Sequence, residues 1–398
     1  MQPESGFSWP QGGRIPTLDG IRAVSIGLVL AAHAIGTGAL PMNGRVAHMA
    51  GDLGVRTFFV LSGFLITTLL MREHRQRGRV SLFDFYVRRA YRIFPAFYAY
   101  LMIVGTLALT GAITLLPGDL LAAATYTTNF HAERSWWTGH LWSLAVEEQF
   151  YIVWPLLLVV LGLARAWGAA LVAMIAAPIV RIAVWQLAPQ HASLVDQAFP
   201  CVFDALATGC LLALAVPHIV KSERCAQVVA SRWFLPAVML GFAPCIVTNP
   251  WIQYGVAMTS ANLAIAAIIV RCVALPASRI SRTLERRGFV WVGTLSYSLY
   301  LWQQLFLNRH SELWMHQFPI NVALAFAAAT ACHYLIERPF LRVSAQRRAA
   351  AEARGIAVLG PANEVLDVSD VRSSQIAKLR RPSTDIAPGR NGPRETLS

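Results

Sequence analysis

Residues 17–36 read TLDGIRAVSIGLVLAAHAIG, a stretch in which almost every residue after Arg22 is apolar or small. Such a run is typical of a helix surrounded by lipid, but it begins with Asp19 and Arg22 and carries His33 deep inside. An ionisable group within hydrocarbon costs about 2.5 kcal/mol or more, so by default it marks a functional position. The stretch therefore predicts a membrane helix that takes part in chemistry.

The rest of the chain has the composition of a protein that crosses the membrane many times. Of its 398 residues, 56% are hydrophobic and only 14% are charged, whereas ordinary soluble domains are about 25% charged. A membrane-spanning helix needs about 20 apolar residues. We expect an all-α polytopic membrane protein with about ten transmembrane helices, centred on residues 21–40, 54–71, 94–115, 144–164, 167–187, 199–216, 233–249, 254–274, 290–308 and 318–337.

A shorter apolar stretch, residues 117–130, decides the topology. If it does not cross and the N-terminus is cytoplasmic, the outer loops contain only Arg45, Arg134 and Arg309 as basic residues. If it crosses, every later loop changes side, which reverses this bias against the positive-inside rule. We therefore expect residues 117–130 to form a short re-entrant or interfacial segment. The protein should be a multi-pass protein of the cytoplasmic (inner) membrane with both termini in the cytoplasm.

The chain divides by composition into three parts. Residues 1–17 form a cytoplasmic segment without the basic-then-apolar order of a signal peptide, and residues 18–341 form the membrane domain. Residues 342–398 are polar, poor in aromatic residues and sprinkled with Pro, Gly and Ser. We expect this cytoplasmic tail to be mostly disordered, with one short helix near residues 345–354.

The net charge of +13 and the six cysteines do not point to a further partner. Lys and Arg residues in loops orient a membrane protein, which accounts for the charge without nucleic acid. The cysteines include no C-x-x-C pair, and several lie in apolar runs, where Cys behaves as a small hydrophobe. We expect the lipid bilayer as the surroundings, no nucleic-acid partner and no metal site.

Arg22 and His33 are eleven residues apart, which is about three full turns of a helix at 100° per residue. They therefore share one helix face, about 16 Å apart along the axis. Arg22 should lie near the cytoplasmic surface and His33 just past the midplane. Each has a structural alternative, Arg22 as an interfacial anchor and His33 as a polar contact within the bundle.

Two further stretches place polar groups in or beside membrane helices. GVRTFFVLSGFLITTLL has Ser62 and Gly63 near its middle, where small residues let another backbone approach closely or simply pack a helix. FYVRRAYRIFPAFYAYL puts Arg89 and Arg92 at i and i+3 on one helix face. Two such guanidinium groups form a fork for phosphates, or an ordinary positive flank of a membrane helix.

HLWSLAVEEQFYIVWPLLL brings two carboxylates into a span, after Trp142. Glu147 and Glu148 point about 100° apart, so at least one should face the interior, because a carboxylate that faces lipid is costly. Arg181 and Asp204 are two more candidates for buried charges. They bind a substrate or form a structural ion pair.

Seven motifs in order give the chain a resemblance to the bacterial membrane acyltransferase 3 family, from about Leu18 to Phe340. They read LDGIRAVSIGLVLAAHA, GVRTFFVLSGFLIT, RRAYRIFPA, HLWSLAVEEQFYIVWP, FDALATGCLLAL, GTLSYSLYLWQ and HYLIERPF. The chain departs from the family pattern at Arg56, Val202 and Gln303, where Asp, a basic residue and His are usual. The soluble esterase-like domain fused to some relatives is not expected here.

The resemblance implies O-acyl transfer, usually of an acetyl group, from cytoplasmic acyl-CoA to a hydroxyl of a sugar or other acceptor. It implies a catalytic role for His33 and a place at the CoA side for Arg89 and Arg92, and we add Arg22 as a third phosphate-binding candidate. Acetyl-CoA would be the donor substrate, with no cofactor bound permanently. The acceptor would be a hydroxylated glycan or glycoconjugate.

We expect His33 to act as a general base on the acceptor hydroxyl, and an acyl-histidine intermediate is an alternative. Glu147 or Glu148 would enter from the outer side to orient the imidazole or to bind acceptor hydroxyls. The substrate-binding candidates are Ser62, Trp142, Arg181 and Asp204.

Two other classes of function use the same intramembrane polar groups. A transporter or channel would use them as a polar relay, and a membrane component that handles polysaccharide would need no catalysis. Transfer of label from acetyl-CoA to a glycan or a small hydroxylated metabolite separates these alternatives. The sequence leaves the identity of the acceptor and the length of the acyl chain open.

Overall fold

The computed structural model describes residues 15–38 and 43–353, and its regular structure there is entirely helical. The elements are α1 (Pro16–Ala34), α2 (Gly44–Arg77), α3 (Leu82–Leu109), α4 (Asp119–Ala124), η1 (Thr128–Phe130), α5 (Trp136–Gly139), α6 (Leu141–Leu187), η2 (Pro189–Asp196), α7 (Phe199–Lys221), α8 (Glu223–Ala230), α9 (Phe234–Leu240), η3 (Ala243–Ile246), α10 (Pro250–Ile252), η4 (Gln253–Ala257), α11 (Met258–Ala274), α12 (Arg279–Leu284), α13 (Arg287–Phe306), η5 (Trp314–His316), α14 (Ile320–Cys332), η6 (His333–Glu337) and α15 (Arg338–Ala353).

Seven helical stretches of the described chain are long and apolar enough to cross a membrane, and α8 with Phe234–Ile246 makes an eighth if this bent pair is one span. The longest stretch, Trp136–Leu187, breaks at Gly162, whose φ of 74° and ψ of 163° are not helical. Positive φ suits glycine, which lacks a Cβ, so α6 consists of two arms. By length and composition the described chain thus has seven or eight candidate spans, and the two arms of α6 with the 20-residue α13 would account for the ten crossings predicted from the sequence.

Large apolar side chains cover the outside of these helices. Those that are more than two-thirds exposed include Leu109, Val160, Leu187, Leu240 and Leu335. A water-soluble monomer rarely exposes apolar surface on this scale, whereas a bilayer surrounds such side chains with hydrocarbon. The all-α polytopic membrane fold is therefore confirmed.

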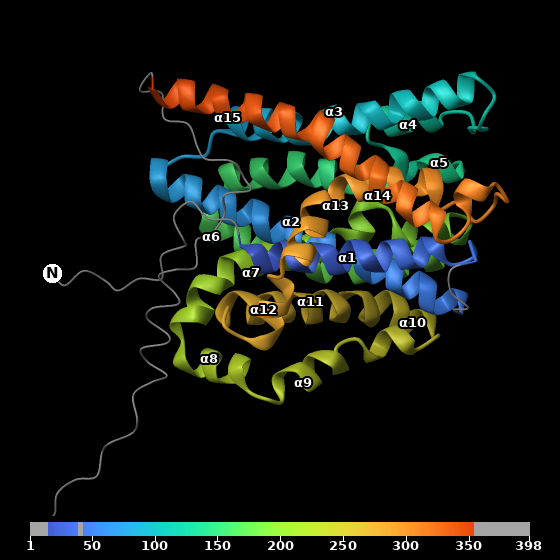
Figure 1. The fold of residues 1–398 in the computed structure, drawn as a ribbon. Helices are drawn as coiled ribbons and strands as arrows, with labels where there is room; N and C mark the ends of the chain where they lie inside the picture. The colour runs from blue at the N-terminus through green and yellow to red at the C-terminus, as the bar shows by residue number, and fades with distance from the viewer. Residues whose placement is uncertain (1–14, 39–42, 354–398) are drawn as a thin grey trace, which may run out of the picture.

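The bundle has two distinct ends (Figure 1). The start of α1, the α2–α3 corner, α8 and α12 lie at one end, whereas α4, α5 and α10 lie at the other. At the α2–α3 corner, Glu73 accepts a hydrogen bond from the Ser81 amide at 2.9 Å and pairs with Arg88 at 3.3 Å. We call this end the basic end, because its α2–α3 corner carries Arg72, Arg75, Arg77, Arg79 and Arg88.

Residues 117–130 do not cross the bundle. The segment turns back along α3, where the Tyr98 hydroxyl donates to the Ala124 carbonyl at 3.1 Å and the Tyr126 ring stacks on Phe97 at 4.4 Å. The chain then returns to α5, whose Trp137 carbonyl accepts from Tyr100 at 2.6 Å. Figure 1 shows α4 and α5 at the same end of the bundle, in agreement with the predicted re-entrant or interfacial segment.

The core of the bundle is built around α1 and α2. α1 packs against α2 and α13, and α2 packs against α7. At the α2–α7 crossing a Cβ on Gly63 would overlap the Leu206 carbonyl, and one on Gly209 would overlap the Val60 carbonyl. Glycine on both sides therefore brings the two backbones into contact, as expected for the Ser62–Gly63 pair. This packing fixes Ser62 in the interior.

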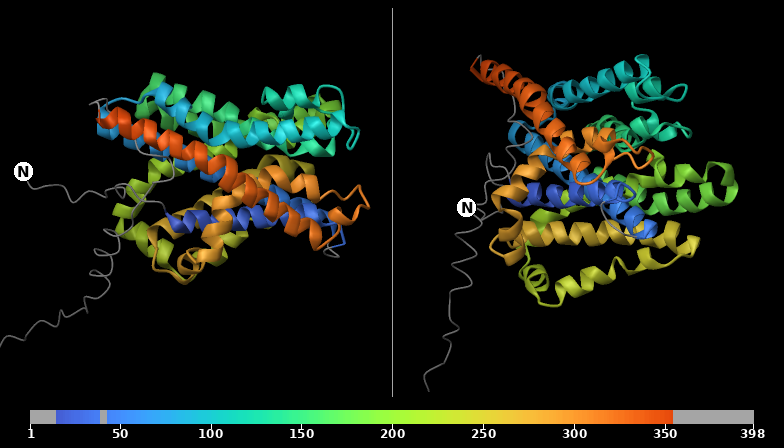
Figure 2. Two further views of the ribbon diagram at one scale, coloured as in Figure 1. Left: turned by 45° about the horizontal axis from the view of Figure 1, so that its top comes forward. Right: turned by 45° about the vertical axis from the view of Figure 1, so that its right-hand side comes forward.

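The last three elements form one nearly continuous rod. Figure 2 shows α14, η6 and α15 running obliquely across the bundle. α15 extends to Ala353, so the expected boundary after residue 341 falls within a helix, and the short helix expected near residues 345–354 lies within this element up to its end. Residues 1–14 and 354–398, which include most of the predicted terminal segments, lie outside the described residues.

Candidate functional site

Two neighbouring cavities inside the bundle contain most of the residues singled out from the sequence. The first, which we call the arginine cavity, has a volume of about 100 Å³ and is lined by Arg22, Ser62, Arg89, Arg92, Glu147 and Glu148, among others. The second, the histidine cavity, has a volume of about 690 Å³ and is lined by His33, Asp52, Arg134, Trp136, His140 and Asp196, among others. Val55 and Tyr300 line both cavities, so the two share a wall.

Two helices supply the three arginines of the arginine cavity. Arg22 on α1 pairs with Asp19 at 3.2 Å, one turn earlier on the same helix. Arg89 on α3 places its guanidinium 5.2 Å from the centre of the Tyr151 ring on α6, within the range of a cation–π contact. Arg92 lines the same cavity, so the i, i+3 spacing directs both α3 arginines to one place.

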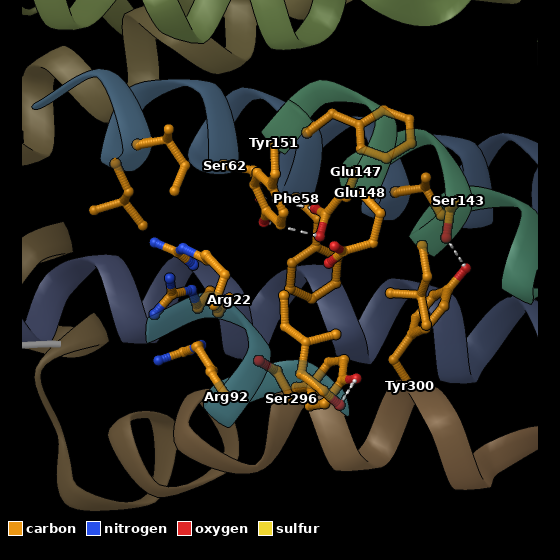
Figure 3. A pocket seen from close by; sticks show the side chains of 18 residues that line it. Arg22, Phe58, Ser62, Arg92, Ser143, Glu147, Glu148, Tyr151, Ser296 and Tyr300 are labelled. Atoms are coloured by element: carbon orange, nitrogen blue, oxygen red, sulfur yellow. Dashed lines mark hydrogen bonds between the residues drawn. The ribbon is translucent and has the colours of Figure 1, made fainter. Parts of the chain in front are cut away.

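Two carboxylates face these cations. Glu147 accepts hydrogen bonds from the Ser62 hydroxyl at 2.8 Å and from the Tyr151 hydroxyl at 3.3 Å. Glu148 lines the same cavity, and Figure 3 shows both carboxylates pointing into it from the side that faces Arg22 and Arg92. We predicted that at least one glutamate would face the interior, and the structure places both there. The charges of each sign thus offset one another in a small buried space.

His33 lies in the last turn of α1, which ends at Ala34, so it is nearer the end of the helix than predicted. Its Nδ1 is 2.9 Å from Oε1 of Gln303, and its ring meets the Trp136 ring edge-to-face at 5.8 Å. His33 lines the histidine cavity, whereas Arg22 lines the arginine cavity. The shared face predicted from their spacing therefore does not bring them into one site.

The wall between the cavities is held by α6 and α13. The Tyr300 hydroxyl donates to the His140 carbonyl at 2.9 Å and lies 2.5 Å from the Ser143 hydroxyl. The His140 ring is itself fixed, because its Nε2 lies 3.1 Å from the Leu301 carbonyl and must donate to it. Nδ1 of His140 then carries a lone pair and has no hydrogen-bond partner within the described chain.

The four substrate-binding candidates fall in three places. Ser62 lines the arginine cavity and Trp142 lines the histidine cavity. Arg181 and Asp204 line neither cavity but form a fully buried ion pair at 3.0 Å, to which the Thr259 hydroxyl also donates, at 2.7 Å from Asp204. This geometry favours the structural alternative for the pair.

Sequence reasoning did not single out Tyr300, Trp136 or Gln304 for a role. Trp136 donates to the Gln304 carbonyl at 2.9 Å, and the side chain of Gln304 accepts from the His140 amide at 3.2 Å. Tyr300 lies within the motif GTLSYSLYLWQ, which was the available signal, but nothing in that motif distinguishes Tyr300 from Tyr297. Among the residues that the structure describes, no group of three or more His, Cys, Asp or Glu side chains is arranged to hold a metal ion.

Comparison with known proteins identifies relatives of most of the chain. A protein of Staphylococcus aureus (strain COL) named "Putative O-acetyltransferase" is 30% identical over 382 residues, which is 85% of this chain and 59% of the relative. The "Peptidoglycan O-acetyltransferase OatA" of Listeria monocytogenes is 27% identical over 323 residues, which is 72% of this chain and 48% of the relative. The chain therefore spans about half of the length of these curated relatives. No solved structure matches it.

A family model described as an acyltransferase domain matches residues 15–338, which include every residue that we assign to either cavity. This range agrees with the span of the seven motifs. The chain therefore belongs to the membrane acyltransferase 3 family.

Proposed function

We propose that this protein is an O-acyltransferase that moves an acyl group, acetyl in the cell, from cytoplasmic acyl-CoA to a hydroxyl of a glycan at the inner membrane. The observation that carries the proposal is the pair of adjoining cavities, one with three arginines and one with a histidine, that share Val55 and Tyr300. The relatives named as peptidoglycan O-acetyltransferases support a glycan acceptor.

The arginine cavity is the proposed donor site. Guanidinium groups bind phosphate through paired, charge-assisted hydrogen bonds, which suits Arg22, Arg89 and Arg92 to the phosphates of CoA. A cavity of about 100 Å³ is far smaller than coenzyme A, so the nucleotide would stay toward the basic end while the thin pantetheine arm enters. On this proposal the basic end and both termini are cytoplasmic, in agreement with the positive-inside rule.

The histidine cavity is the proposed acceptor site. Its volume of about 690 Å³ suits a sugar unit, and aromatic and polar side chains line it together. Trp136 and Trp142 offer ring faces, while Asp52 and Arg134 offer hydrogen bonds to hydroxyl groups. Such a site would bind a hydroxylated acceptor beside the imidazole of His33.

His33 is the proposed general base. Because Nδ1 lies beside an amide oxygen, it carries the proton, and Nε2 is left with a lone pair. The acceptor hydroxyl attacks the thioester carbonyl carbon while its proton passes to Nε2. The carbon–sulfur bond then breaks, the CoA thiolate takes the proton from His33, and the new ester is released.

Glu147 and Glu148 would act at the donor site on this proposal. They line the arginine cavity and not the histidine cavity, so orienting the imidazole of His33 does not fit their position. Their carboxylates are placed instead to accept hydrogen bonds from amide N–H groups of the pantetheine arm and to balance the arginine charges.

Permeabilised membranes that contain the protein, supplied with acetyl-labelled acetyl-CoA and peptidoglycan glycan strands, test the proposal. We expect label in the glycan that mild base releases as acetate, because an O-ester is labile to base and an N-acetyl group is not. Membranes with His33→Ala should give background label. A transporter would instead carry a solute across sealed vesicles and leave no ester, which would overturn the proposal.

A further inference from the structure

Tyr300 lies beside the route that an acyl group would take from one cavity to the other. It lines both cavities, whereas Arg22 and Arg92 line only the arginine cavity and His33 only the histidine cavity. Figure 3 shows Tyr300 and Ser143 joined by a hydrogen bond at the end of the arginine cavity that lies away from Arg22 and Arg92. Its ring therefore forms part of the wall between the cations and the imidazole.

The Tyr300 ring is held firmly in this wall. Its hydroxyl donates a hydrogen bond to the His140 carbonyl at 2.9 Å and lies at hydrogen-bond distance, 2.5 Å, from the Ser143 hydroxyl. Phe58 on α2 meets the ring edge-to-face at 6.4 Å, and only 6% of Tyr300 is exposed. Moving the ring requires both hydrogen bonds to break inside the protein, where they are costly to leave unmade.

This arrangement limits the length of the acyl group that a bound acyl-CoA can carry, an inference that rests on the proposed function. A thioester that enters through the arginine cavity approaches Tyr300 with its acyl group foremost. An acetyl group adds only a methyl beyond the carbonyl, whereas each further methylene must enter the volume of the phenol ring. Rejection by size discriminates about 10-fold to 200-fold per methylene in enzyme pockets.

We propose that Tyr300 sets the acyl-chain length that the enzyme accepts, as the wall of the donor site that the acyl group meets. The ring, rather than the hydroxyl, carries this selectivity. Removing the ring joins the two cavities and makes room for longer chains, whereas removing only the hydroxyl leaves the ring between Phe58 and α6.

Competition between two donors measures this selectivity directly. Permeabilised membranes receive acetyl-CoA and butyryl-CoA together with peptidoglycan glycan strands, and the acetate and butyrate that mild base releases are quantified. Their ratio reports the ratio of kcat/KM for the two donors. We expect acetyl to dominate in the wild type, and Tyr300→Ala to raise the butyrate share at least tenfold. Tyr300→Leu, a milder truncation that keeps the site apolar, should shift it in the same direction.

Two control variants test whether the ring of Tyr300 itself sets the ratio of acetate to butyrate. Tyr300→Phe should keep the wild-type ratio, because the ring remains. Tyr297→Ala removes a ring of equal size from the same helix and the same cavity, but Tyr297 does not line the histidine cavity. It should change the ratio far less than Tyr300→Ala.

An unchanged ratio in both Tyr300→Ala and Tyr300→Leu, with acetyl transfer still measurable, would overturn this inference and leave the proposed function intact. An equal shift in Tyr297→Ala would overturn it too, because cavity volume would then set the limit. No transfer from any acyl-CoA by the wild type would overturn the proposed function itself.

Discussion

The Nδ1 atom of His33 lies 2.9 Å from Oε1 of Gln303, which joins the last turn of α1 to the last turn of α13. Gln303 is fully buried, and it follows Leu301 and Trp302 at the position where the resemblance led us to expect His. The amide oxygen accepts a hydrogen bond from the Nδ1–H group and so selects one tautomer of the imidazole. The departure therefore supplies a partner for the proposed base.

His33→Ala should leave the protein folded in the membrane and reduce transfer by about 10²-fold to 10⁴-fold, the usual contribution of a general base. Base-released acetate measures transfer, and detergent-extracted yield with a single size-exclusion peak measures folding. His74→Ala is the matched control, because His74 is exposed near the end of α2 and lines neither cavity. Near-normal turnover in a folded His33→Ala protein would rule out the catalytic role.

Gln303→Leu should lower kcat about tenfold to a hundredfold with little change in the KM for acetyl-CoA, because a misplaced imidazole costs rate rather than donor binding. Gln303→His, which introduces the residue usual in the family, should retain more activity than Gln303→Leu, since a ring nitrogen can also accept the Nδ1 proton. Steady-state kinetics at varied acetyl-CoA separate the two parameters. Equal kcat values for Gln303→Leu and the wild type would show that the bond has no role in positioning.

Arg89→Lys/Arg92→Lys should express normally and raise the KM for acetyl-CoA about tenfold or more. Lysine keeps the positive charge but loses the planar fork, and each lost charge-assisted bond is worth about 1.5–3 kcal/mol. The KM for the glycan should change little. Arg75→Lys/Arg79→Lys is the matched control, since both arginines are exposed at the basic end. If Arg89→Lys/Arg92→Lys leaves the KM for acetyl-CoA unchanged, these two arginines serve only as topology signals.

The proposed topology places the basic end in the cytoplasm. Reporter fusions after Gly78, Lys221, Arg286 and Ser398 should all read cytoplasmic, whereas fusions near Arg134 and His191 should read external. Gly78 follows α2 at the basic end, and Arg134 follows the re-entrant segment at the other end. A cytoplasmic signal at His191 would contradict the ten-crossing arrangement.

Arg181→Ala should destabilise the protein by about 3–5 kcal/mol, because Asp204 would remain buried without its partner. Arg181→Met/Asp204→Leu should recover much of this loss, since both charges are then gone. Thermal unfolding in detergent measures the difference. A substrate-binding role would appear instead as a raised KM in the double variant at unchanged stability.

The sequence predicted the parts of this fold that depend on local pattern. Apolar runs located the spans, loop charge predicted that residues 117–130 do not cross, and the spacing of Arg89 and Arg92 placed both on one face. Local pattern could not show that α1 ends directly after His33, which moved this residue into a second cavity. Gln303, the partner of His33, comes from α13, 270 residues away, and only the packing of α1 against α13 brings the two close.

The wall at Tyr300 also has a consequence for the energy supply of the cell. Two polar cavities that adjoin within one bundle would, without a partition, form a file of water along which protons could leak and dissipate the membrane potential. A buried phenol ring that is held by two hydrogen bonds interrupts such a file. On the proposed function, a carbonyl group reaches an acceptor from the opposite side while the bilayer stays sealed to ions. Tyr300→Ala vesicles that carry a pH-sensitive dye should therefore lose an imposed pH gradient faster than Tyr300→Phe vesicles.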